Sequence, residues 1–187
     1  MIKATIKKVD RAVKVDADIR SVSALQVYVG IPEEKTGRRK DPVNNAQLLY
    51  IHTNGSPARN IPARAVIEPA IEAKGNKEPI AEELASAARA TLQERNATAA
   101  NRHLQKAGMI GQNAARSWFT DPRNGWAKNS EETAKKKLHK LQGKNLQAFN
   151  KKISAGASIT DTDISRPLID TGQLRKSIIY VVKGNGK

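Results

Sequence analysis

Residues 44–71 read NNAQLLYIHTNGSPARNIPARAVIEPAI, and the organisation of the first half of the chain depends on this stretch. Asn44 and Gln47 have the spacing of a capping box, in which each side chain satisfies a main-chain amide at the start of a helix. Gly55 suits the left-handed position just beyond a helix end. The sequence therefore predicts a short helix over 44–54.

The second part of the stretch is dominated by proline. Pro57 and Pro62 each remove a hydrogen-bond donor and restrict the preceding residue, so no regular element is expected between them. Pro69 can occupy the first turn of a new helix. The prediction is a helix, a rigid loop that holds Arg59 and Arg64 on its outside, and a second helix, with a plain surface connection as the alternative.

Composition limits the classes of protein to consider. The chain has 187 residues, a net charge of +15, 4 % aromatic residues and no cysteine. These numbers predict a single domain with a thin aliphatic core and no disulfide or thiol chemistry. A charge this large requires an anionic partner, which is nucleic acid, an acidic protein surface or anionic lipid. No apolar run is long enough to span a membrane or form a signal peptide, so synthesis in the cytosol is expected.

Patterning along the chain predicts both strands and helices. Alternating β-branched residues predict strands at 13–19 and 27–31, and residues 178–182 also read as a strand. Helical spacing of apolar residues predicts helices at 77–95, 97–119 and 130–149. Helix 97–119 has a stripe of small residues that would allow another helix to approach closely. The expected domain covers residues 1–182, with long inserted loops at 33–43 and 143–165 and a flexible tail at 183–187.

Candidate catalytic and metal-binding residues do not form a recognisable set. The three histidines, at 52, 103 and 139, lack the spacing of zinc ligands. The triplet Asp170-Thr171-Gly172 is similar to that of aspartic proteases, but their chemistry needs two such carboxylates. We expect no catalytic residue, no cofactor and no metal site, so the chain is not predicted to be an enzyme. Asp170 is instead expected to cap the turn that follows, and Gly172 to allow close approach of the backbone.

Two segments resemble one family of phage proteins. YIHTNGSPARNIPAR at 50–64 and RPLIDTGQLRKSI at 166–178 are similar, in this order, to the signature of neck and tail-completion proteins of the HK97 gp10-like, virion-morphogenesis group. A Trp-x-x-x-Ser-x-x-Thr segment beginning at Trp126 also fits. The family usually has Pro-Phe where this chain has Ala65 and Val66. The resemblance covers roughly residues 25–182, and its specific parts are much shorter.

The resemblance implies an α+β fold in which a small, mostly antiparallel sheet packs against two or three helices with long loops. It also implies a structural virion protein, located at the phage neck or the head-proximal end of the tail and made in the host cytoplasm. The implied partners are a homo-oligomeric ring of roughly six or twelve copies, head-completion or connector proteins, tail terminator or tube proteins, and double-stranded DNA in the lumen. No membrane is expected. Gly55, Pro62, Asp170, Thr171 and Gly172 would be structural members of the motifs.

The excess positive charge suggests a division of roles. Phosphate-directed lysines can contact moving DNA without reading bases, whereas arginine suits paired carboxylates on a protein. The hypothesis is that the lysine-rich run lines the DNA channel, through Lys135, Lys136, Lys137, Lys140 and Lys144. The arginines would lie at protein interfaces, through Arg38, Arg39, Arg59 and Arg64. A solvated outer face explains the lysines equally well, and a nucleoid-like DNA-binding protein is the alternative function.

Overall fold

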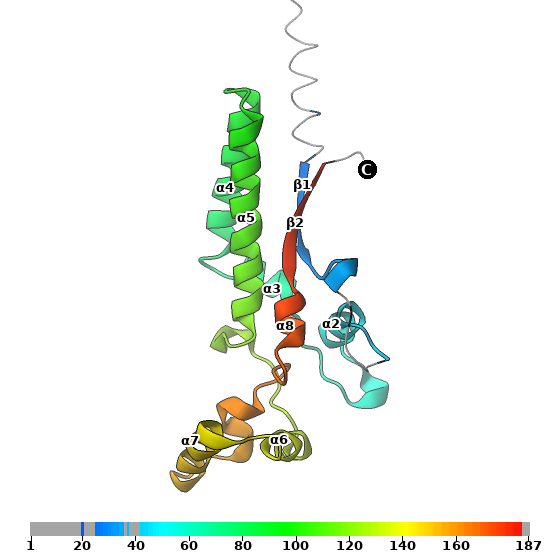
Figure 1. Ribbon diagram of the computed structural model, residues 1–187, viewed down its shortest axis with the longest axis vertical. Helices are drawn as coiled ribbons and strands as arrows, with labels where there is room; N and C mark the ends of the chain where they lie inside the picture. The colour runs from blue at the N-terminus through cyan, green and yellow to red at the C-terminus, as the bar shows by residue number, and fades with distance from the viewer. Residues whose placement is uncertain (1–19, 21–24, 36, 38–41, 185–187) are drawn as a thin grey trace, which may run out of the picture.

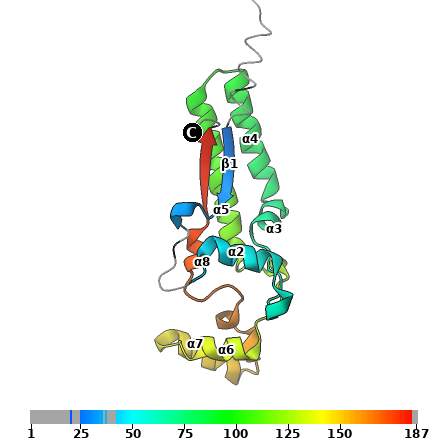
Figure 2. The same cartoon turned by 90° about the vertical axis from the view of Figure 1, so that its right-hand side faces the viewer.

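The computed structural model describes residue 20 and residues 25–35, 37 and 42–184. The strand expected at 13–19 and the loop arginines Arg38 and Arg39 lie outside these residues. Figures 1 and 2 show an elongated molecule, with a long helical hairpin beside a small sheet at one end and a group of short helices at the other. The fold is α+β with an antiparallel sheet, as the resemblance implied.

The sheet has two strands, and they come from opposite ends of the described chain. Strand β1 (Leu25–Gly30) pairs antiparallel with β2 (Ile179–Gly184), with Leu25 opposite Gly184 and Gly30 opposite Ile179. Both strands were predicted, from alternating valines in β1 and from a run of β-branched and aromatic residues in β2. The tail predicted at 183–187 begins too early, because the first two of its residues belong to β2 and residues 185–187 are outside the description.

Helices α4 (Lys77–Leu92) and α5 (Ala97–Trp118) form the hairpin. Asn96 caps α5 by accepting from the Ala99 amide at 2.9 Å. A hydrogen bond of 2.6 Å between His103 Nδ1 and Glu83 Oε2 joins the two helices. Both helices were predicted, and the loop between them is correspondingly short.

The small-residue stripe of α5 faces the sheet as well as α4. A Cβ atom on Gly108 would lie 2.4 Å from Cδ2 of Tyr180, and one on Gly111 would lie 3.0 Å from Cγ2 of Val29. The stripe therefore allows a strand pair, not only a helix, to approach α5 closely. Arg116 fastens the same face by donating from Nε to the Ile178 carbonyl at 2.9 Å.

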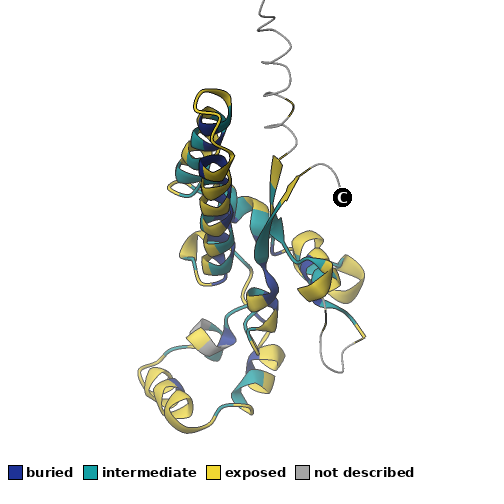
Figure 3. Cartoon of the chain, turned by 45° about the horizontal axis from the view of Figure 1, so that its top comes forward, coloured by how far each residue is buried: buried dark blue, intermediate teal, exposed yellow. Residues whose placement is uncertain are grey.

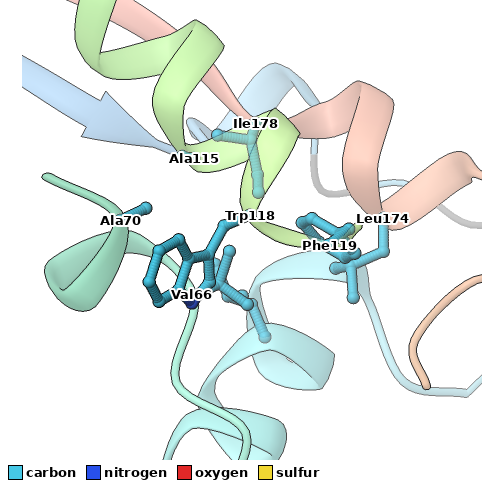
Figure 4. Packing of buried hydrophobic residues seen from close by; sticks show 8 residues of the cluster. Val66, Ala70, Ala115, Trp118, Phe119, Leu174 and Ile178 are labelled. Atoms are coloured by element: carbon cyan, nitrogen blue, oxygen red, sulfur yellow. The ribbon is translucent and has the colours of Figure 1, made fainter. Parts of the chain in front are cut away.

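The main core lies where α5 ends. Figure 4 shows Trp118 at the end of α5 and Phe119 directly after it. They lie among Val66, Ala70 of α3 (Ile67–Glu72), Leu174 of α8 (Gln173–Ser177) and Ile178, which directly precedes β2. Val66 and Ile178 are fully buried there. Phe119 also contacts Trp126 edge-on, with ring centroids 5.8 Å apart. Burying an aliphatic or aromatic side chain stabilises by about 1.5–3 kcal/mol, so this cluster holds α2, α3, α5 and α8 together.

Helix α2 (Asn45–Asn54) lies on the other side of the core from the hairpin (Figure 1). Both bonds of the predicted capping box are present, because Asn44 Oδ1 accepts from the Gln47 amide at 2.8 Å and Gln47 Oε1 accepts from the Asn44 amide at 3.0 Å. Leu49 is the buried apolar residue of this helix. Pro69 lies in the first turn of α3, as expected.

The helix predicted over 130–149 is two helices. Helix α6 (Glu131–Leu138) ends well before Gly143, and α7 (Gly143–Ser154) begins there. Gly143 has φ 57°, a left-handed conformation that an α-helix cannot contain. The loop predicted at 143–165 was therefore wrong for its first half, and the second half holds two short 3₁₀ turns, at Ile159–Asp161 and Asp163–Ser165.

The hairpin and the α6–α7 unit differ in how far their residues are buried. In Figure 3 the buried residues of the hairpin follow its inner side, whereas α7 is exposed over most of its surface. Phe149 is the buried residue of α7 and Ala134 that of α6. The α6–α7 unit is thus attached through few apolar contacts.

Candidate functional site

A cleft of about 790 Å³ lies between three segments that are far apart in the sequence. Its walls are the loop after α2, the first turns of α6 with the residues before them, and the segment that leads into α8. The lining residues are Leu48, His52, 59–62, Arg64, 128–130, Glu132, Thr133, Lys137 and 168–174. Both motif segments named above, 50–64 and 166–178, therefore contribute to one cleft.

The first wall is a tight loop whose shape depends on Gly55. Gly55 has φ 73°, and a Cβ atom there would lie 2.9 Å from both the Ala63 nitrogen and the Ile61 oxygen. Ser56 and Ile61 form an isolated antiparallel bridge, with Ser56 N donating to Ile61 O at 2.8 Å. Asn60 adopts a left-handed conformation at the turn between them. Gly55 follows α2 with a positive φ, as expected, and Pro62 lies directly after the bridge.

Arg64 is buried, which corrects the expectation that it is held out on the loop. Its side chain is 7 % exposed. Nε and Nη2 donate to the Ala127 carbonyl at 3.2 and 2.9 Å. Burial lowers the pKa of the Arg64 guanidinium, because removal from water disfavours the charged form. Arg64 therefore joins the loop to the segment before α6, whereas Arg59 is exposed at the rim of the cleft.

Lys137 is also turned inward, which corrects its assignment to a DNA channel. Its ammonium donates to the carbonyls of Arg166 and Ile169, each at 2.6 Å. Burial is the main cause that lowers its pKa, with smaller contributions from Arg64 and Lys140 opposed by Asp170. Lys137 thus ties α6 to the third wall of the cleft.

The third wall differs from its prediction in two respects. Asp170 does not cap the following turn, because its carboxylate pairs with Lys140 at 2.8 Å and Gly172 is the residue that precedes α8. Gly172 is structural through φ 74°, but no atom within 4 Å would meet a Cβ atom there, so close backbone approach was wrong. Thr171 Oγ1 accepts from the Gln173 amide at 3.4 Å and supplies the local turn.

The other lysines of the run are exposed, and most of them pair with acids. Lys136 and Lys140 contact Glu132 and Asp170 at 2.6 and 2.8 Å, and Lys135 lies 3.7 Å from Glu131. Lys144 is exposed on α7. The run therefore does not form one unpaired basic face, because acids just before it and on the third wall neutralise part of it.

Three residues of the cleft region were missed as cross-links between segments. Trp126 Nε1 donates to the Ala65 carbonyl at 3.1 Å, and Asn129 Nδ2 donates to the Ser165 carbonyl at 2.6 Å. Lys137 binds residues of the second motif segment, whereas Trp126 and Asn129 bind Ala65 and Ser165, which directly adjoin the two motif segments. Only Trp126 carried a signal, as part of its motif, since main-chain carbonyl acceptors exist at every residue and leave no mark in a sequence.

The net character of the cleft is basic and partly apolar. Arg59, Arg64, Lys128 and Lys137 line it, against Glu132 and Asp170. Leu48, Ile61, Leu168 and Leu174 supply apolar surface between the charges. Such a lining suits a ligand that carries both negative and apolar groups.

Comparison of the chain with protein-family models, curated proteins and solved structures finds no match in any of the three. Within residues 20, 25–35, 37 and 42–184, no group of three or more His, Asp or Glu side chains is placed to hold a metal ion. Across the same residues, no helix combines the length and apolar character that a membrane span requires. The site is thus defined by its geometry and by the two motif segments.

Proposed function

We propose that this chain is a structural virion protein that assembles as a ring at the phage neck or the head-proximal end of the tail. The observation that supports the proposal is that both motif segments, separated by about a hundred residues of helical structure, line one cleft. If the two segments belong to one family signature and serve one function, they are expected to lie close together in the folded chain. Unrelated coincidental matches would have no reason to meet.

The exposed apolar side chains agree with a protein that is covered by neighbours. Tyr50 on α2 is 71 % exposed, Tyr28 on β1 is 52 % exposed and Met109 on α5 is 47 % exposed. They lie on different elements, so several faces of the subunit would be buried in a closed ring.

A non-specific DNA-binding protein is the second candidate, and the net charge of +15 favours it. A protein of this class neutralises phosphates with exposed cations, so its affinity falls steeply with salt. Lys144 and Lys151 on α7 are exposed cations of this type. The two candidates differ in the oligomeric state that they predict for the protein in the absence of DNA.

Size-exclusion chromatography with light scattering separates them. The full chain, with and without a short DNA duplex, should elute as a closed oligomer in both cases if the proposal is correct. Negative-stain images of that fraction should show rings with a central opening. A monomer or dimer that binds DNA with a steep salt dependence would contradict the proposal and support the second candidate.

A further inference from the structure

Arg64 and Lys137 are two inward-turned cations whose hydrogen bonds go to main-chain carbonyls, and Asp170 acts on Lys137 through its charge without a hydrogen bond. Among the described residues neither forms an ion pair, and both are held by main-chain carbonyls of 127, 128, 166 and 169. Carbonyl dipoles fix the position of a cation but do not neutralise it. The two charges also repel one another, since each belongs to the lining of the same cleft. An anionic group in the cleft would relieve both effects.

Arg59 adds a third cation to the cleft, and its side chain is free to change conformation. It lies at the rim, is exposed, and its guanidinium has no hydrogen-bond or ion-pair partner in the described part of the chain. A guanidinium in this position can form the planar, two-bond contact that carboxylates accept. The cleft thus combines two fixed cations inside with one adaptable cation at its mouth.

The size and lining of the cleft select the class of ligand. A volume of about 790 Å³ holds a few side chains of an extended segment, and ligand pockets commonly have about 300–1,000 Å³. A DNA duplex is too wide to enter it. Glu132 and Asp170 on the same lining would repel a continuous row of phosphates, whereas an acidic segment can place its carboxylates selectively. The apolar positions Ile61 and Leu168 would remain unused by a phosphate backbone.

We propose that this cleft is a docking site for an extended acidic segment of a partner protein, whose carboxylate lies between Arg59, Arg64 and Lys137 and whose apolar side chains contact Ile61 and Leu168. The inference rests on the proposed function, because the partner would be a protein of the adjoining ring. It specifies which surface of the subunit makes that contact and which chemistry the contact uses.

The test measures binding of a short fluorescein-labelled peptide rich in glutamate and leucine to the full chain, by fluorescence anisotropy. A peptide with glutamine in place of each glutamate is the ligand control. Arg59→Gln should weaken binding on the order of tenfold, which corresponds to about 1.4 kcal/mol. Arg102→Gln removes the same charge from an exposed position on α5, away from the cleft, and should leave the affinity within about twofold.

Three results would overturn the proposal. They are no binding of the glutamate peptide, equal losses in the Arg59 and Arg102 variants, or a larger effect of Arg59→Gln on affinity for a DNA duplex than on affinity for the peptide. The last result would make the cleft a phosphate site. Arg59 is exposed, so its variant should fold normally, and circular dichroism verifies this.

The outcome separates this inference from the proposed function. A chain that forms rings but does not bind the peptide contradicts the docking site alone. A chain that binds the peptide through Arg59 but remains monomeric contradicts the ring alone.

Discussion

Gly108 is where α5 and the sheet approach most closely. A Cβ atom there would lie 2.4 Å from ring atom Cδ2 of Tyr180, 2.7 Å from ring atom Cγ and 3.1 Å from the Tyr180 Cβ atom. Because these atoms are close to the main chain of Tyr180, rotation of the ring cannot remove the overlap. We expect Gly108→Ala to lower the free energy of unfolding by about 1–3 kcal/mol, as overpacking does.

Urea denaturation measures the Gly108→Ala effect, and Gly30→Ala is the matched control. A Cβ atom on Gly30 of β1 would meet nothing within 4 Å. The control should therefore leave the urea midpoint unchanged or raise it slightly. Equal midpoints for the two variants would show that the sheet does not pack on α5 as described.

Arg59 and Arg64 lie in one loop but have different environments, which permits a matched comparison. Arg64→Ala leaves the carbonyls of Ala127 and Lys128 without their donor inside the protein. An unsatisfied buried group costs about 1–3 kcal/mol, so thermal unfolding of this variant should occur at a lower temperature. Arg59→Ala should change stability by less than about 0.5 kcal/mol. Equal effects would mean that Arg64 is not buried in solution.

The ion pairs of Asp163 should make the stability of the protein depend on pH in the acid range. A hydrogen bond from Lys152, and also the charge of Arg166, lower the pKa of Asp163 below its ordinary value of 3.8. A carboxyl group with a lowered folded-state pKa stabilises fully above its unfolded pKa, and this contribution is lost as pH falls through the folded pKa. We expect the free energy of unfolding to fall below about pH 4, and to fall less in Asp163→Asn.

The side chain of Asp163 is 60 % exposed, so its ion pairs are screened by salt. The difference between Asp163→Asn and the unchanged chain should therefore shrink at high ionic strength. Chemical denaturation at several pH values measures it. Parallel pH profiles for the two chains would contradict the pairing with Lys152.

At the scale of elements, local signals were sufficient for the start of α2, where the predicted capping box at Asn44 is present. Asn96 and Ser130 also cap α5 and α6, whose starts were predicted from the spacing of apolar residues. The break between α6 and α7 was missed, because apolar residues at helical spacing continue across it at Leu138, Leu141 and Leu146.

The attachment of α7 rests on Phe149. Phe149 is 6 % exposed, whereas Leu146 on the same helix is 36 % exposed. Replacing a buried phenylalanine by alanine costs about 3–5 kcal/mol, so Phe149→Ala should release α7 even where the main core remains folded. Limited trypsin digestion should then cut at Lys144, Lys151 and Lys152 much faster than in Leu146→Ala. Similar rates for both variants would show that α7 is held by other contacts.

At the scale of the whole molecule, exposed cations without an acid partner are the ones available to DNA, and α7 carries two of them. Lys144 and Lys151 have no acid partner in the described residues, whereas Lys135 and Lys136 have glutamates one turn away. The double variant Lys144→Gln, Lys151→Gln should have a shallower salt dependence. The slope of the logarithm of the DNA-binding constant against the logarithm of salt concentration should fall in magnitude by about one to two. The double variant should leave the oligomeric state unchanged.

Lys135→Gln with Lys136→Gln removes the same charge from paired positions and serves as the control for the α7 lysines. Filter binding at several salt concentrations gives both slopes. A larger effect of the control pair would mean that α6 and not α7 meets the phosphates.

The cleft shows why the fold was more predictable than the site. The turn at Gly55 follows from residues next to one another, and it was predicted. The bond from Arg64 to Ala127 spans 63 residues, and its acceptor is a main-chain carbonyl that every residue possesses. A charged side chain in a loop is usually solvated, so nothing local distinguishes Arg64 from Arg59. Contacts of this kind follow only from the assembled tertiary structure.

The pairing of β1 with β2 has a consequence for how the protein is made. The first strand is complete early in translation, but its partner Ile179–Gly184 leaves the ribosome only after the intervening helices. Until then the glycine face of α5 and the inner face of β1 have nothing to cover them. Contacts between distant parts of a chain form slowly, because the entropy of closing the large loop must be overcome first. The nascent chain thus carries an uncovered strand through most of its synthesis, and a chaperone that shields such edges would act during this interval.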